Sequence, residues 1–229
     1  MSKLLVLTLD AITARGDRHL YPGVVGRLNW LRSQGWMMVI VSNQPDCDWQ
    51  VVDARDLTVG SYFCMYRDNG TLSNRTHSVE SLEHKRYFVD IRTASLGWLW
   101  IGSDEKVMTR TKTFNQALDE MTAAADLCGI EDLIMCPFRD GHNAIERAKV
   151  GGVWRHDFVE LQESNGVSVK YGDFLLPGPG MLNRAKRLSL NGFDRCVFVG
   201  TEPHDRGAAD AGDFEYVDYE DWRTSRVTI

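Results

Sequence analysis

The start of the chain alternates between apolar runs and polar ends in a pattern that predicts secondary structure directly. Positions 4–9 form an apolar run that contains one polar residue, Thr8, and ends at Asp10, which predicts a buried parallel strand with a carboxylate at its carboxyl end. A loop is expected over 11–19. Tyr21-Pro22-Gly23 then opens a helix whose apolar positions recur at helical spacing, and Gly35 lies where a C-cap glycine belongs.

A second apolar run, 36–41, predicts another buried strand, and it ends in the polar residues Ser42, Asn43 and Gln44. A strand, a helix and a second strand in this order form a βαβ unit. Ligands of open α/β sheets bind beyond the carboxyl ends of the strands. Asp10 and Ser42 are therefore predicted to be neighbours in a cleft.

Helical and strand patterns return in the second half of the chain. The clearest is an amphipathic helix over Thr113–Leu127, with Thr113 at its N-cap and Gly129 after its end. The other expected elements are a strand at 133–135, a hairpin whose strands 153–159 and 167–171 flank 163–166, a helix at 180–190, a strand at 196–199, a helix start at 205–211, a strand at 215–217 and a surface turn at 218–222.

Residues 50–111 carry a different pattern of short, β-rich runs at 61–66, 86–91 and 97–102, with a turn signal at Asp68-Asn69-Gly70. We interpret this stretch as an inserted β-rich element. The expected fold class is α/β, with residues 1–49 and 112–229 forming a core around a mostly parallel sheet flanked by helices.

Composition narrows the classes of function. The 229 residues are 43% hydrophobic and carry a formal net charge of −6, which argues against non-specific binding to nucleic acid or to anionic membranes. No signal peptide and no transmembrane segment are expected, because no apolar run approaches the roughly 20 residues of a membrane span. The five cysteines are scattered and odd in number, which is typical of a reducing, cytoplasmic-type compartment.

Metal-ligand spacing is not evident among the cysteines and histidines. Cys136 is followed by His142, but the further cysteines that a zinc site would need are missing, so Cys136 is interpreted as structural. His156 has no partner histidine at ligand spacing and is assigned to a surface or hairpin position.

Several segments, taken in order, resemble motifs of the haloacid dehalogenase-like (HAD) superfamily of phosphatases. The closest similarity is to the branch of the histidinol-phosphate, heptose-bisphosphate and polynucleotide 3′-phosphatases. The segments that carry the resemblance are the strand ending at Asp10, Tyr21-Pro22-Gly23-Val24, Ser42-Asn43-Gln44, 177–182, and 198–205 with Ala208-Ala209 and Ala211-Gly212. The resemblance implies a Rossmann-like HAD fold in which 50–111 is a cap-like insertion.

The chain departs from the family pattern at the positions that perform the chemistry. The resemblance places Thr8 at the aspartate nucleophile and Asp10 at the general acid/base. Leu176 stands at the phosphate-binding lysine, and Thr201 stands at a Mg²⁺-binding aspartate. The phosphate-binding Ser42 is retained.

These replacements predict a weakened or absent phosphatase activity. A threonine hydroxyl is a poor nucleophile without a base, and Mg²⁺ prefers sites to which carboxylates supply charge. Leucine cannot stabilise charge on a transferring phosphoryl group. We therefore expect a pseudophosphatase that acts as a protein-binding or structural component, without a cofactor and with a vestigial acid/base at Asp10.

Two further hypotheses remain open. The chain is alternatively a Mg²⁺-dependent phosphatase or nucleotidase with a rebuilt site, in which Glu202 and Asp205 bind the metal. A third hypothesis is a sensor that holds a phosphorylated ligand through Ser42 and Asn43 and through the helix N-terminus after Gly200. The preferred hypothesis predicts a protein partner, and a location in the cytoplasm or in a particle assembled inside the cell.

Overall fold

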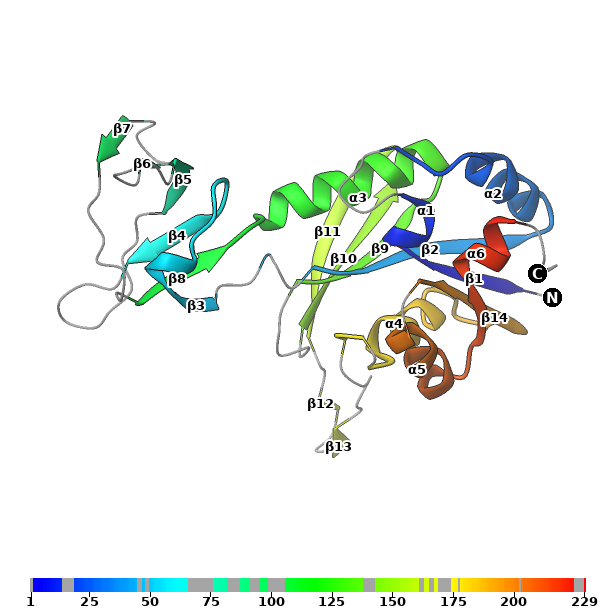
Figure 1. Cartoon of the computed structure of the whole chain (residues 1–229). Helices are drawn as coiled ribbons and strands as arrows, with labels where there is room; N and C mark the ends of the chain where they lie inside the picture. Colours follow the sequence, from blue (N-terminus) through cyan, green and yellow to red (C-terminus); the bar gives the residue numbers. More distant parts are fainter. Residues whose placement is uncertain are drawn as a thin grey trace. The chain divides into compact units, whose positions relative to one another are not determined.

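The protein was analysed as a computed structural model (Figure 1), which describes residues 2–13, 19–44, 47, 50–65, 76–81, 87–90, 95–98, 106–137, 143–160, 163–164, 167–168, 174–176, 178–201, 203–224 and 229. The chain divides into two compact units. The first combines Met1–Pro45 with Leu118–Ile229, and the second is Asp46–Ala117.

The first unit is built around one large sheet. Its strands are β1 (Lys3–Thr8), β2 (Trp36–Asn43), β9 (Asp132–Cys136), β10 (Asn143–Val150), β11 (Val153–Glu160), β14 (Arg195–Gly200) and β15 (Glu215–Asp218). They form a seven-stranded sheet in the order β11-β10-β9-β2-β1-β14-β15. The strands from β9 to β15 in this order run parallel, whereas β10 runs antiparallel to both of its neighbours, β9 and β11. The sheet is therefore mixed but mostly parallel.

Helices lie on both faces of this sheet (Figure 1). They are α1 (Leu9–Ile12), α2 (Val24–Ser33), α3 (Phe114–Cys128, in this unit from Leu118 onward), α4 (Gly180–Lys186), α5 (Pro203–Gly212) and α6 (Tyr219–Arg223). Figure 1 shows α2 and α3 on one face, and α4 and α5 on the other. The first unit is thus a mixed α/β structure with helices flanking its sheet.

The apolar runs form the centre of this unit because their strands are covered on both faces. In β1, residues 4–7 are fully buried, as continuous apolar sequence in a central parallel strand requires. The face towards α4 and α5 holds a cluster in which alternate strand residues, such as Leu4, Val6 and Val39, pack with Met181. This cluster is called the α4–α5 core below.

Most predicted elements of the first unit are confirmed within a few residues. The helix after Tyr21-Pro22-Gly23 is α2, and Gly35 follows its end with a φ of +80°. The helix predicted from Thr113 is α3, which is followed by Gly129 with a φ of +65°. The strands expected at 36–41, 133–135, 196–199 and 215–217 are β2, β9, β14 and β15, and the helix expected at 205–211 is α5.

The end of the first strand was predicted wrongly. Strand β1 ends at Thr8, and Leu9 and Asp10 belong to the short helix α1, so the expected loop begins as a helix. Helix geometry buries Leu9, Ala11 and Ile12. The helix expected at 180–190 is also shorter, because α4 ends at Lys186.

The hairpin predicted around 163–166 is wrong in its larger part. Strand β11 pairs with β10 instead and joins the main sheet. Gly151 and Gly152 turn between these strands with φ values of +60° and +81°, which glycine adopts without steric cost and a tight hairpin turn demands. The short strands β12 (Glu163–Ser164) and β13 (Val167–Ser168) pair only with each other.

The surface turn expected at 218–222 is a helix. Asp218 caps α6 by accepting a hydrogen bond from the backbone N–H of Glu220 at 2.8 Å. Trp222 is 0% exposed and is among the largest buried side chains. Burial of this large side chain outweighs the acidic character of the segment.

The second unit is an antiparallel sheet with a small core of its own. Its strands are β3 (Gln50–Asp53), β4 (Tyr62–Met65), β5 (His77–Ser81), β6 (Tyr87–Asp90), β7 (Ser95–Trp98) and β8 (Lys106–Arg110), in the order β3-β8-β4-β5-β6-β7, and η2 (Ala54–Asp56) is a 3-10 turn. Phe63, Val79 and Val107 form its core with Ala54 and Leu57. The β-rich runs predicted in this region are thus found as strands, as far as the described residues extend. None of the described helices of the chain is long and apolar enough to cross a membrane.

Candidate functional site

Thr8 lies at the carboxyl end of the central strand, at the position of the predicted nucleophile. It is the last residue of β1 and the N-cap of α1, and it lies opposite Val41 of β2. Its side chain is 7% exposed, and its hydroxyl has no hydrogen-bond partner among the described residues. A buried hydroxyl without a partner keeps its full desolvation cost. Asp10 is half-buried in α1, and its proximity to Ser42 stays a prediction.

Ser42 and Asn43, the predicted phosphate-binding residues, both form hydrogen bonds within the chain. The Oδ1 atom of Asn43 accepts a hydrogen bond from the backbone N–H of Leu176 at 3.2 Å. The Ser42 hydroxyl accepts from Nε2 of Gln44 at 2.8 Å and lies 3.4 Å from the Asn43 carbonyl oxygen, to which it donates. To donate to a phosphate, the Ser42 hydroxyl would have to give up its hydrogen bond to the Asn43 carbonyl oxygen.

The side chains of Ser42 and Asn43 also point to opposite faces of the sheet. Successive side chains of a strand point to opposite faces of the sheet. Val41 belongs to the α4–α5 core, so Asn43 is directed to the same face and Ser42 to the other. Val6 also belongs to that core, which directs Thr8 to the face of Asn43.

Leu176, at the position where the resemblance would place a phosphate-binding lysine, is a core residue. Leu176 is 8% exposed and packs in the α4–α5 core, as does its neighbour Phe174. A charged side chain buried at this position would pay a large desolvation penalty unless it found a partner. Leu176 therefore contributes packing to the core and no positive charge.

Asp205 of α5 faces the end of β14. It is 1% exposed, and its Oδ2 atom accepts a hydrogen bond from the backbone N–H of Thr201 at 2.8 Å. Nε2 of His204 lies 3.4 Å from Oδ1 of Asp205. A Cβ atom added to Gly200 would lie only 2.5 Å from the Asp205 Cβ, so glycine is required there. Glu202 lies outside the described residues.

These residues do not fit the Mg²⁺ ion that the resemblance implies. Mg²⁺ demands near-octahedral oxygen coordination, with carboxylates that neutralise its charge. Thr8 and Thr201 supply neutral groups at two of the carboxylate positions. The carboxylate of Asp205 is buried and bonded to a backbone N–H group. No catalytic step through a metal is therefore derived for this site.

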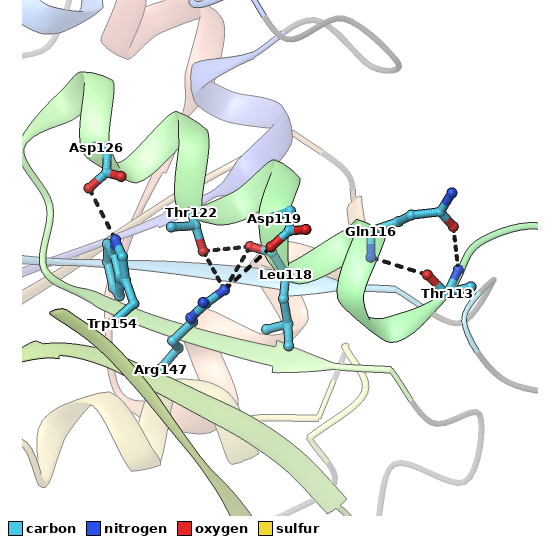
Figure 2. Close-up of polar contacts among 8 residues, drawn as sticks. All are labelled: Thr113, Gln116, Leu118, Asp119, Thr122, Asp126, Arg147 and Trp154. Carbon is cyan, nitrogen blue, oxygen red and sulfur yellow. Dashed lines mark hydrogen bonds and ion pairs between the residues drawn. The ribbon is translucent and has the colours of Figure 1, made fainter.

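A second group of polar residues joins α3 to the β10–β11 hairpin, and the sequence analysis did not identify it (Figure 2). The Nη1 atom of Arg147 in β10 donates to the Thr122 hydroxyl at 2.8 Å and lies 3.9 Å from Oδ1 of Asp119. The Nε1 atom of Trp154 in β11 donates to Oδ1 of Asp126 at 3.1 Å.

This group stabilises the packing of helix on sheet. Lys149 lies 2.8 Å from Oδ1 of Asp126, and its hydrogen bond lowers the pKa of that carboxyl, with a smaller contribution from the Trp154 hydrogen bond. The signal that could have revealed it is the alternation of Arg147 and Lys149 along β10. None of these contacts pairs a nucleophile with a base, so they point to a structural role.

Comparison with known proteins gives little similarity. No protein-family model matches the chain, and no curated protein sequence matches it. Among solved structures, the Pelota protein of Thermoplasma acidophilum aligns with 11% sequence identity and a TM-score of 0.22, over 75% of this chain and 58% of that one. The chain thus spans less than two thirds of that protein, and the similarity is too slight to support an argument.

Proposed function

We propose that this chain is a catalytically degenerate HAD-like protein, a pseudophosphatase that acts as a protein-binding or structural component. The topology supports the family assignment, because β1 lies between β2 and β14 and the motif residues follow the carboxyl ends of these strands. This is the edge at which open α/β sheets bind ligands.

The proposal rests on the contacts that Leu176 makes in the core and with Asn43. The side chain of Leu176 is part of the α4–α5 core, and its backbone N–H binds the Asn43 side chain. A phosphatase needs a preorganised positive group where negative charge develops. Here an apolar side chain packed in the core occupies the position that would provide it.

The first test is phosphate release with Mg²⁺ from p-nitrophenyl phosphate, nucleotides, 3′-phosphorylated DNA and sugar phosphates. The wild-type chain is expected to release no more phosphate than the Asp10→Asn variant. The Thr8→Asp variant is also expected to stay silent, because Leu176 and Thr201 remain. Turnover by the wild type that Asp10→Asn abolishes would show that the proposal is wrong.

Ligand binding without turnover is tested separately by thermal unfolding. A ligand that binds the folded state raises the unfolding temperature, and the stabilisation grows with the logarithm of the ratio of its concentration to its dissociation constant. We expect no rise with Mg²⁺, inorganic phosphate or vanadate. A rise with phosphate alone, lost on Ser42→Ala, would favour the sensor of phosphorylated ligands instead.

One observation favours the alternative of a rebuilt phosphatase or nucleotidase site. The Thr8 hydroxyl is buried at the nucleophile position without a partner among the described residues, as a group kept for a substrate would be. Thr8→Val separates the two functions, because it removes the hydroxyl and keeps the shape. A rebuilt enzyme would lose activity, whereas a structural protein has none to lose. Removal of the unsatisfied group should raise stability in both cases.

Thr13→Val is the matched control for this variant. Its hydroxyl is equally buried but donates to the Leu9 carbonyl oxygen at 3.1 Å. Loss of a satisfied hydrogen bond should lower the free energy of unfolding by about 1 kcal/mol.

A further inference from the structure

The outer strand of the large sheet is long and carries charges along its edge. Strand β11 spans Val153–Glu160 and stands at the end of the strand order, and among the described residues only β10 pairs with it. Its central residues Arg155, His156 and Asp157 are exposed. Open edges of this kind present unpaired backbone N–H and C=O groups to another strand.

The sequence of β11 is chemically symmetric about His156. Reading outward from this residue, the strand meets a pair of opposite charges, then a pair of aromatic residues, then a pair of valines. These pairs are Arg155 and Asp157, Trp154 and Phe158, and Val153 and Val159. Two such strands placed antiparallel about His156 would set Arg155 of each opposite Asp157 of the other.

The free backbone groups of β11 fit this arrangement. Residues on either side of a tight two-residue turn form a hydrogen-bonded pair, and such pairs alternate along an antiparallel ladder. Val153 lies opposite Val150 next to the Gly151–Gly152 turn, so the odd-numbered residues of β11 bond to β10. The even-numbered residues, His156 among them, direct their N–H and C=O groups outward.

We propose that β11 pairs with β11 of a second copy of this chain, antiparallel and centred on His156. The two sheets then continue into one another across a two-fold axis, which is the self-complementary interface that a symmetric dimer requires. In this register His156 exchanges both backbone hydrogen bonds with its counterpart. Arg155 and Asp157 fall in the non-hydrogen-bonded pairs, where opposing side chains lie closest.

The charges of Arg155 and Asp157 favour this register over its neighbours and favour a second copy of β11 as the partner. A shift of two residues in one direction would place Arg155 opposite Arg155, and a shift in the other direction would place Asp157 opposite Asp157. Opposite charges across a strand pair stabilise it and like charges destabilise it. The charges that normally protect an edge strand are therefore neutralised by the inverse order of charges on a second copy.

The first experiment measures the mass of the full chain by sedimentation over a concentration series at low salt. The wild type is expected to dimerise as concentration rises. The variants R155D and D157R each place like charges at two opposing pairs, and we expect about tenfold weaker dimerisation from pair energies of this size. D210R changes charge equally at an exposed position of α5 and is expected to dimerise as the wild type does.

The decisive experiment mixes the two single variants. In a pair of one R155D chain and one D157R chain, each charged position of one strand faces the opposite sign on the other. The mixture is expected to dimerise at least as well as the wild type, although each variant alone dimerises about tenfold more weakly. The double variant R155D/D157R is expected to dimerise again by itself.

Three results would overturn the inference. They are a wild type that stays monomeric over the whole concentration series, a dimer that neither single variant weakens, and a mixture that stays monomeric. Circular dichroism and thermal unfolding of each variant show that the fold is retained. None of these readouts depends on phosphatase chemistry, so the inference stands or fails independently of the proposed function.

Discussion

Gly200 and Asp205 pack so closely that there is no room for a methyl group on residue 200. Gly200→Ala would bring a Cβ atom to 2.5 Å from the Asp205 Cβ, and we expect this overpacking to lower the free energy of unfolding by about 1–3 kcal/mol. Denaturant unfolding measures the change. Gly26→Ala is the control, because no heavy atom lies within 4 Å of the added Cβ in α2.

The control variant is expected to change the free energy of unfolding in the opposite direction. Alanine in the interior of a helix is favoured over glycine by about 0.8–1 kcal/mol, so Gly26→Ala should stabilise the protein. Equal effects of the two substitutions would contradict the contact between β14 and Asp205.

Asp132, at the start of β9, should make stability fall as pH rises. Burial raises the pKa of its carboxyl to about 6, with further contributions from Glu146 and Glu131. A carboxyl whose pKa is higher in the folded than in the unfolded chain costs stability as pH rises from about 4 through about 6. Asp132→Asn should therefore stabilise the protein at pH 7, and this gain should vanish below about pH 4.

Asp126→Asn is expected to show the opposite pH dependence when the stability of both variants is measured by urea unfolding at a series of pH values. The hydrogen bond from Lys149 lowers the pKa of Asp126, so its contribution to stability is present above the unfolded pKa of about 4 and is lost as pH falls. The variant should destabilise the protein at pH 7, and the difference should shrink in acid. If the stability of both variants relative to the wild type changed in the same direction with pH, the environments described for Asp132 and Asp126 would be wrong.

At the scale of elements, the start of α3 depends on a reciprocal capping box. The backbone N–H of Gln116 donates to the Thr113 hydroxyl at 3.2 Å, and the backbone N–H of Thr113 donates to Oε1 of Gln116 at 2.8 Å (Figure 2). Thr113→Ala should lower the free energy of unfolding by about 1 kcal/mol. A double-mutant cycle with Gln116→Ala should show that the effects of the two substitutions are not additive.

The sequence predicted best those elements whose buried faces are uniformly apolar. The strands β1 and β2 are apolar throughout because helices cover both faces, and α3 has a single apolar stripe. Strand β10 was missed because it meets polar partners on both faces. Arg147 binds Thr122 of α3, whereas Glu146 lies 2.7 Å from Arg184 of α4, so its sequence lacks a clear apolar period.

The candidate site residues stay predictions, because only the resemblance assigns Thr8, Leu176 and Thr201 to their positions. Their environments could not be read from the sequence. The hydrogen bond from Leu176 to Asn43 joins residues 133 positions apart, and no local pattern encodes it. The same holds for Trp222, whose burial depends on the helices and strands around α6 rather than on its acidic neighbours.

At the scale of the whole molecule, the two units have separate cores. Phe63→Ala removes a fully buried ring from the core of the second unit, at an expected cost of about 3–5 kcal/mol. Amide hydrogen exchange in the full chain should therefore accelerate in β4 and β8 and stay unchanged in β1 and β2. Leu5→Ala should give the converse pattern, and uniform acceleration by either variant would show one cooperative unit.

The first unit is divided along the chain, and this has a consequence for the newly made polypeptide. Ser2 hydrogen-bonds to Asp194, 192 residues away, where β14 joins β1. At about 5–20 residues per second, a ribosome needs roughly 10–40 s to make the intervening chain. The second unit is complete by Ala117, well before β14 exists. The apolar strand β1 is therefore synthesised long before its neighbour β14, and during this time its edge lacks that partner.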